Sequence, residues 1–81
     1  MKVYITCSNH RRFLFLANRL GIMWSLDNIV WVPSSDPIKL RGVGNATVLF
    51  DEDVNLFDST WELAVTSLRA GRCNIFQLKE L

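Results

Sequence analysis

The chain has 81 residues, nearly half of them apolar, and a formal net charge of +1 at neutral pH. That length allows a single domain (residues 1–81) with a core only just large enough for stability, and the composition excludes an intrinsically disordered chain. The charge excludes the strongly basic character of most nucleic-acid-binding proteins, so a nucleic-acid partner is not expected. Residues 1–41 nevertheless carry six bases against two acids, and residues 42–81 three bases against six acids. Such a dipolar surface favours steering of a charged partner protein.

Two cysteines, Cys7 and Cys73, are too few and too far apart to indicate a disulfide framework. They favour reduced, buried thiols in a cytoplasmic protein. No apolar run approaches the roughly 20 residues of a transmembrane helix, so no membrane partner is expected. The amino-terminal stretch has no cleavage-site pattern and does not predict a signal peptide.

The first third of the chain predicts a strand followed by a helix. Val3–Cys7 is rich in β-branched and aromatic residues, and its lack of clean alternation is typical of a strand buried on both faces. Ser8 and Asn9 are good N-cap residues for a helix over His10–Leu20, and Gly21 is a natural stop. The apolar positions of this helix recur with helical spacing and predict its core face: Phe13, Leu16, Ala17 and Leu20.

The middle of the chain predicts two strands joined by a long connection. Ile29–Val32 forms the second strand, which Pro33 ends. Residues 33–45 are the longest irregular stretch, with several proline and glycine breakers, and a loop of that length in a small domain is often functional. Thr47–Phe50 forms the third strand. The sequence leaves open whether this strand runs parallel or antiparallel to the others.

The last third predicts a second helix and a fourth strand. Ser59 and Glu62 fit a capping box, in which the serine accepts from the N3 amide and the glutamate reaches back. Gly71 is expected to stop this helix, and Asn74–Leu78 to form the last strand. The core face of the second helix is predicted at four positions: Trp61, Ala64, Val65 and Leu68.

The order of these elements, β-α-β-β-α-β, predicts an α/β domain. Strand-helix-strand alternation at this spacing favours a small, mostly parallel four-stranded sheet with right-handed crossovers. Two helices cover both faces of four strands only sparingly. We therefore expect one thinly covered face, which would favour self-association into a homo-oligomer.

The third strand leads directly into three acids. The apolar run Ala46–Phe50 is followed by Asp51, Glu52 and Asp53, which is the Walker B pattern of apolar residues before Asp-Glu. In that pattern the aspartate holds Mg²⁺ through water and the glutamate orients the attacking water. The alternative is a solvent-exposed acidic turn at the end of a strand.

The residues that precede the acids extend this pattern. Residues 40–46, with Arg41-Gly42 a few residues ahead of the acidic strand, resemble the run into Walker B of phage terminase and helicase-like P-loop ATPases. Val3–Leu20 resembles the strand and helix that carry motif Ia in such motors. The resemblance implies that the chain corresponds to the middle of an ATPase core, with the three acids as Mg²⁺ residues. The phosphate-binding sequence G-x-x-x-x-G-K-[ST] is missing, however, so the chain alone is not expected to hydrolyse nucleotides.

A second candidate site follows the first strand, where helix amides attract anions in α/β folds. Ser8, Asn9, Arg11 and Arg12 form the predicted anion-binding set. Together with Cys7, this run resembles the C-x5-R loop of small tyrosine phosphatases, but Arg12 comes one residue too early. The alternative is a buried cysteine, a capping residue and two solvated arginines.

Aromatic and apolar residues outside the predicted core are candidates for partner binding. Trp24 and Phe57 lie in connecting segments, and Leu14 and Phe15 lie off the apolar stripe of the first helix. Tryptophan is enriched at interface hot spots. The other large aromatics are expected in the core: Trp31, Trp61 and Phe76.

Two functions remain compatible with these patterns. The preferred one is a small non-enzymatic protein-interaction domain, plausible for a phage or mobile-element accessory protein, that binds and modulates another protein without a cofactor. The alternative is a small Mg²⁺-dependent phosphate-ester enzyme, or a nucleotide- or anion-binding domain. It would use the anion-binding set and the acids after the third strand, because both follow strands and would meet at one edge of a parallel sheet.

Overall fold

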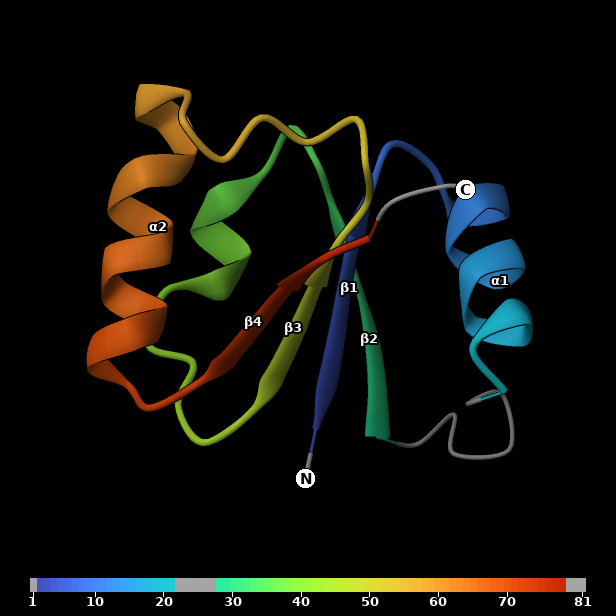
Figure 1. The fold of residues 1–81 in the computed structure, drawn as a ribbon, viewed down its shortest axis with the longest axis horizontal. Helices are drawn as coiled ribbons and strands as arrows, with labels where there is room; N and C mark the ends of the chain where they lie inside the picture. Colours follow the sequence, from blue (N-terminus) through green and yellow to red (C-terminus); the bar gives the residue numbers. More distant parts are fainter. Residues whose placement is uncertain (1, 22–27, 79–81) are drawn as a thin grey trace.

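The computed structural model describes residues 2–21 and 28–78, so the candidate partner residue Trp24 lies outside the described residues. Four strands form one sheet in which every neighbouring pair is parallel (Figure 1). The strands are β1 (Val3–Cys7), β2 (Ile29–Pro33), β3 (Thr47–Phe50) and β4 (Asn74–Gln77), in the order β2-β1-β3-β4. The predicted α/β class is confirmed, and the direction of the third strand, which the sequence left open, is parallel.

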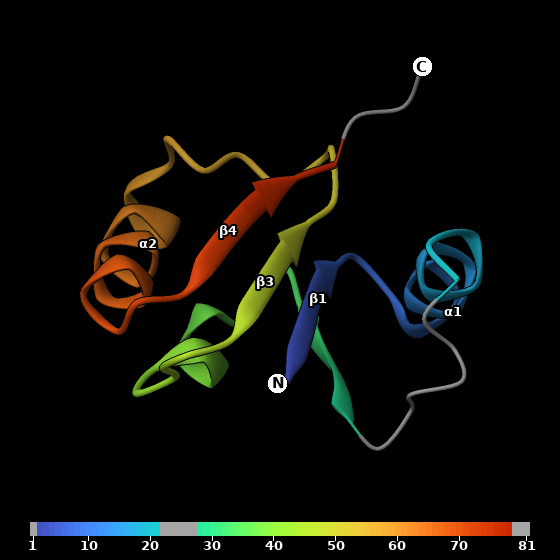
Figure 2. The same cartoon turned by 60° about the horizontal axis from the view of Figure 1, so that its bottom comes forward.

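The helices lie on opposite faces of the sheet, as Figures 1 and 2 show for α1 (His10–Arg19) and α2 (Ser59–Ala70). The chain first steps from β1 to β2 and then returns past β1 to β3. Because parallel crossovers are right-handed, reversing the direction of travel moves the connection to the other face. The short 3₁₀ helix η2 (Pro37–Leu40) therefore lies with α2.

The core is divided by the sheet into two clusters of buried side chains. Successive residues of a strand point to opposite faces, so Ile5 packs with α1 while Tyr4 packs with the α2 cluster. The α1 cluster consists of Ile5, Cys7, Phe13, Leu16, Ala17 and Ile29. The α2 cluster consists of Val32, Leu40, Val48, Phe50, Val54, Trp61 and Leu68. Burial on both faces explains why the apolar strand sequences do not alternate with polar residues.

Helix α1 begins where its capping residue predicts. The Asn9 side-chain oxygen accepts a hydrogen bond from the Arg12 amide at 2.8 Å. Leu20 was predicted to lie on the core face, but it forms the C-cap and is 42% exposed. Gly21 follows with φ +72°, the left-handed conformation that glycine adopts without strain.

Helix α2 ends at Gly71 as predicted, but it begins with a different N-cap residue. The N-cap is Asp58, whose carboxylate accepts from the Thr60 amide at 2.8 Å, so the predicted capping box at Ser59 is wrong. Gly71 has an ordinary φ of −81°, and Arg72 takes the left-handed conformation at φ +60°. Glycine is required at 71 for another reason: a Cβ there would lie 2.7 Å from the Val43 carbonyl oxygen.

The connection predicted as irregular contains η2 and contributes to the core. Leu40, the last residue of η2, is 1% exposed and packs in the α2 cluster. Pro33 was predicted to end the second strand, but it is the last residue of β2 and pairs with Cys7 of β1. An edge strand tolerates proline, since its missing amide need not serve the ladder.

On one of its two faces, half of the sheet has no described helix over it. On the α1 side, α1 packs over β1 and β2, and no described element covers β3 and β4 (Figure 2). We call this surface the open face and define it by Leu49, Phe76 and Leu78. Leu49 and Phe76 are register partners, and Leu49 and Leu78 pack against the edge of the α1 cluster. The expected thin cover of one face is thus observed.

Candidate functional site

The two candidate sites meet at the carboxyl edge of the sheet, between β1 and β3. These neighbouring strands are parallel, and their following connections leave toward opposite faces. Arg12, on the first turn of α1, thereby reaches Asp51, the residue directly after β3. In open α/β sheets, this reversal of strand order is where ligands usually bind.

Arg12 and Asp51 form a two-pronged ion pair. Arg12 Nε donates to Asp51 Oδ2 at 2.8 Å, and Nη2 donates to Oδ1 at 3.0 Å. The Glu52 amide donates to Oδ1 as well, at 2.9 Å. These hydrogen bonds, led by those from Arg12, hold the pKa of Asp51 below its usual value although burial acts in the opposite direction. Asp51 is therefore an ionised carboxylate that is only 2% exposed.

This pairing occupies the group that a Walker B aspartate would offer to Mg²⁺. Both Asp51 oxygens accept hydrogen bonds, and a cation would have to compete with the Arg12 guanidinium. Glu52 and Asp53 are exposed, and Glu52 Oε1 lies 4.0 Å from Arg12 Nη2. Over residues 2–21 and 28–78, no three His, Cys, Asp or Glu side chains are grouped to hold a metal ion.

Two members of the predicted anion-binding set, Arg12 and Asn9, are committed to other contacts. Arg12 binds Asp51 and also stacks on Phe15, with its guanidinium carbon 5.2 Å from the ring centroid. Asn9 caps α1 with its side chain and donates to Ser8 Oγ at 3.5 Å. Arg11 is exposed to solvent. An anion would therefore meet a cation already neutralised by Asp51.

Cys7 lies at the end of β1 with its side chain in the α1 cluster. It is fully buried, and its thiol donates to the Asn9 carbonyl at 3.4 Å. Burial raises the pKa of the Cys7 thiol, and the negative charge of Asp51 raises it further. The thiolate is the nucleophilic form, so Cys7 is a poor nucleophile here. Both Cys7 and Cys73 are free thiols, and Cys7 is buried as predicted, whereas Cys73 is only partly buried.

The predicted partner-binding residues are exposed but do not form one surface. Leu14 and Phe15 are 40% and 47% exposed on α1, and Phe57 is 95% exposed in the connection between β3 and α2. Phe76 was predicted to be a core residue but is 55% exposed. The sequence predicts one thinly covered face, but nothing local indicates that Phe76 lies on it, because the edge position of β4 is set by the strand order.

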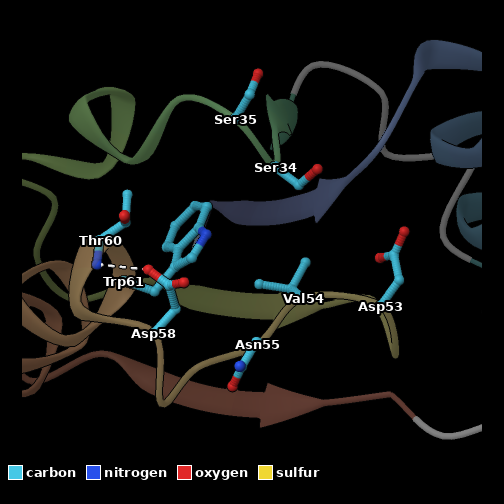
Figure 3. A pocket seen from close by; sticks show the side chains of 8 residues that line it. All are labelled: Ser34, Ser35, Asp53, Val54, Asn55, Asp58, Thr60 and Trp61. Atoms are coloured by element: carbon cyan, nitrogen blue, oxygen red, sulfur yellow. Dashed lines mark hydrogen bonds between the residues drawn. The ribbon is translucent and has the colours of Figure 1, made fainter.

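A polar pocket of about 320 Å³ opens at the start of α2, between the connections that follow β2 and β3 (Figure 3). Two connections and the first turn of α2 form its walls. It is lined by Ser34, Ser35, Asp53, Val54, Asn55, Asp58, Thr60 and Trp61. We call it the switch-point pocket. The sequence placed Asp53 with the Walker B acids, and in the structure Asp53 lines this pocket, whereas Asp51 does not.

Comparisons with protein-family models, with curated proteins and with solved structures found no match for this chain. Within the described ranges, neither α1 nor α2 has the length and apolar character needed to cross a bilayer. Evidence for function therefore lies in the surfaces of the molecule.

Proposed function

We propose that this domain is a non-enzymatic interaction module that binds a helix of another protein at the open face. The observation that carries the proposal is Phe76, a large aromatic side chain 55% exposed on a parallel sheet. Parallel sheets are normally covered by helices on both faces, because their strands are apolar on both sides. Here the cover stops halfway across one face.

The dimensions of the open face suit a single helix. Two strands about 4.8 Å apart present a strip about 10 Å wide, which is close to the diameter of an α-helix with its side chains. The strip is uncharged, since the residues that point to this side from β3 and β4 are Thr47, Leu49, Asn74 and Phe76. An amphipathic helix would find apolar contacts here without burying a charge.

The ion pair supports this function over the alternative. An Mg²⁺-dependent enzyme needs Asp51 free for water or metal, and an anion site needs Arg12 free, whereas each neutralises the other. The resemblance to the Walker B region of phage terminases supports an accessory role in a phage or mobile element, acting on a motor protein in the cytoplasm. That part of the proposal rests on analogy.

The test compares two phenylalanines that differ in position. Wild-type protein, Phe76→Ser and Phe57→Ser serve as baits in an extract of the host cell, and circular dichroism with urea unfolding verifies that each is folded. Phe57 is the matched control because it is the more exposed ring and lies outside the open face. We expect a protein that wild type and Phe57→Ser retain and Phe76→Ser loses.

A photo-crosslinking residue at position 76 then locates the contact. The expected crosslink joins position 76 to an amphipathic helix of the retained protein. Crosslinks only between two copies of this chain would show a homo-oligomer interface instead. Retention of no protein, or equal retention by both serine variants, would refute binding at the open face.

A further inference from the structure

The switch-point pocket lies where α/β sheets of this kind bind ligands, yet neither candidate site from the sequence describes it. Ser34 and Ser35 approach from the connection after β2, and Asp53–Asn55 from the connection after β3. Since β2 and β3 flank β1, these two connections close over the carboxyl end of β1. That crevice is the general ligand position of open α/β folds.

The indole N–H of Trp61 is a hydrogen-bond donor that faces the pocket. Trp61 is 5% exposed, and its ring packs edge-on against Phe50 with centroids 5.4 Å apart. Figure 3 shows the indole nitrogen turned toward the pocket. The nitrogen is not among the fully buried atoms that lack a partner, so it is open to the pocket, where a ligand oxygen can accept from it in place of water.

An unsatisfied polar group lies on the same side of the sheet. Thr6 Oγ1 is fully buried and has no hydrogen-bond partner among the described residues. Thr6 pairs in register with Phe50, the residue against which Trp61 packs. Thr6 does not itself line the pocket, so the carboxyl end of β1 has an unmet hydrogen-bonding group near the pocket rather than in it.

The charge of the lining selects the class of ligand. The pocket contains two carboxylates, Asp53 and Asp58, and no lysine, arginine or histidine. The hydrogen bond from the Thr60 amide lowers the pKa of Asp58, which therefore stays ionised. Phosphates and other anions are repelled by such a lining, and a cation is attracted.

We propose that the switch-point pocket binds an organic cation, an ammonium or guanidinium group with a carbonyl or hydroxyl oxygen nearby. The charged group pairs with Asp53, and the oxygen accepts from the Trp61 indole N–H. The side-chain hydroxyls of Ser34 and Thr60 supply further hydrogen bonds. Both a free amine and a basic residue of a bound protein have this chemistry. The proposal is independent of the open face.

The experiment is an NMR titration of ¹⁵N-labelled protein, read at the indole N–H resonances, with Trp61→Phe used to assign the Trp61 signal. The probes are N-acetyl-arginine amide, guanidinium chloride at matched ionic strength, inorganic phosphate and glucose. We expect the arginine amide to shift the indole N–H of Trp61 and the amides around Asp53. Phosphate and glucose should leave them in place.

Two variants that each remove one negative charge distinguish binding at the pocket from a general effect of the protein's net charge. Asp53→Asn should weaken binding of the arginine amide at least fivefold. Glu62→Gln, which removes an exposed acid of α2 outside the pocket lining, should leave binding unchanged. Asp58 is not altered because it caps α2.

The outcomes decide the proposal. Tighter binding of the arginine amide than of guanidinium supports it and indicates a basic residue of a partner protein, whose carbonyl oxygen accepts from the Trp61 indole N–H. Equal binding would show that a cation without an oxygen suffices and would overturn the role of Trp61. Absent shifts, shifts with phosphate or glucose of the same size, or equal weakening by Asp53→Asn and Glu62→Gln would overturn the whole proposal.

Discussion

Arg12 and Asp51 lie 39 positions apart in the chain and form a two-pronged ion pair. Their contact decides the chemistry of the carboxyl edge of the sheet. Arg12 neutralises the carboxylate that a Mg²⁺ site needs, and Asp51 neutralises the cation that an anion site needs. A two-pronged guanidinium–carboxylate pair is also more specific in geometry than a single contact. The same pair fastens α1 to the end of β3, so it has a structural role.

Removing the arginine should destabilise the fold. Arg12→Ala leaves the Asp51 carboxylate, 2% exposed, with only the Glu52 amide as a donor, and we expect a loss of about 3 kcal/mol in the free energy of unfolding. Urea denaturation measures it. Arg11→Ala, one residue away and exposed, should change stability by less than about 0.5 kcal/mol. Equal effects of the two substitutions would contradict a structural ion pair.

The lowered pKa of Asp51 predicts how stability depends on pH. In the unfolded chain this carboxyl takes up a proton near its ordinary pKa of about 3.9, while the folded form resists protonation. Folded protein thus gains stability from Asp51 above that pH and loses it as the pH falls through the lower, folded pKa.

Unfolding measured between about pH 6 and pH 2 tests this dependence. Asp51→Asn should be less stable than wild type at neutral pH, and its stability should fall less steeply on acidification. Asp58, whose pKa is also lowered, keeps some slope in both proteins. Parallel curves for wild type and Asp51→Asn would show that the carboxylate contributes nothing to the acid sensitivity.

At the scale of the elements, the beginning of α2 shows how a correct helix prediction can rest on the wrong residue. Ser59 and Glu62 satisfy the capping-box pattern, but Asp58 precedes them and is itself a strong N-cap residue. The chain uses Asp58, and Ser59 becomes the first helical residue. The element was predictable from its apolar stripe, whereas its boundary depended on a local competition between caps.

Two alanine substitutions distinguish these caps. Asp58→Ala removes the acceptor for the Thr60 amide and should lower the midpoint of thermal unfolding by several degrees. Ser59→Ala should leave it nearly unchanged, because alanine is favoured inside helices. A larger loss of thermal stability in Ser59→Ala than in Asp58→Ala would instead support the predicted capping box.

At the scale of the whole molecule, close contacts between distant connections hold the two layers in place. The turn after α2 passes against the connection before β3, where the Asn45 amide donates to the Gly71 carbonyl oxygen at 2.9 Å. A side chain at position 71 would collide with backbone rather than with a movable side chain. This junction sets the position of α2 over the sheet.

Gly71→Ala should therefore cost about 2 kcal/mol in the free energy of unfolding, because the backbone around Val43 must shift. Gly44→Ala is the matched control. Its Cβ would lie 3.3 Å from the Gly71 oxygen, a milder approach, so its cost should be smaller. Chemical denaturation of both variants measures the difference, and a larger effect at Gly44 would contradict this reading of the junction.

The α/β class, the four strands and the two helices follow from the sequence alone, because apolar period, capping residues and glycine stops are local properties. The meeting of the two candidate segments was predicted for a parallel sheet, and the parallel direction of β3, which the sequence left open, brings it about. Tertiary structure decided what that meeting does. Strand order places Arg12 against Asp51, puts Asp53 in the lining of the switch-point pocket and leaves Phe76 without a described helix above it. None of these has a local signature, because each depends on which strands become neighbours and on which face a connection crosses.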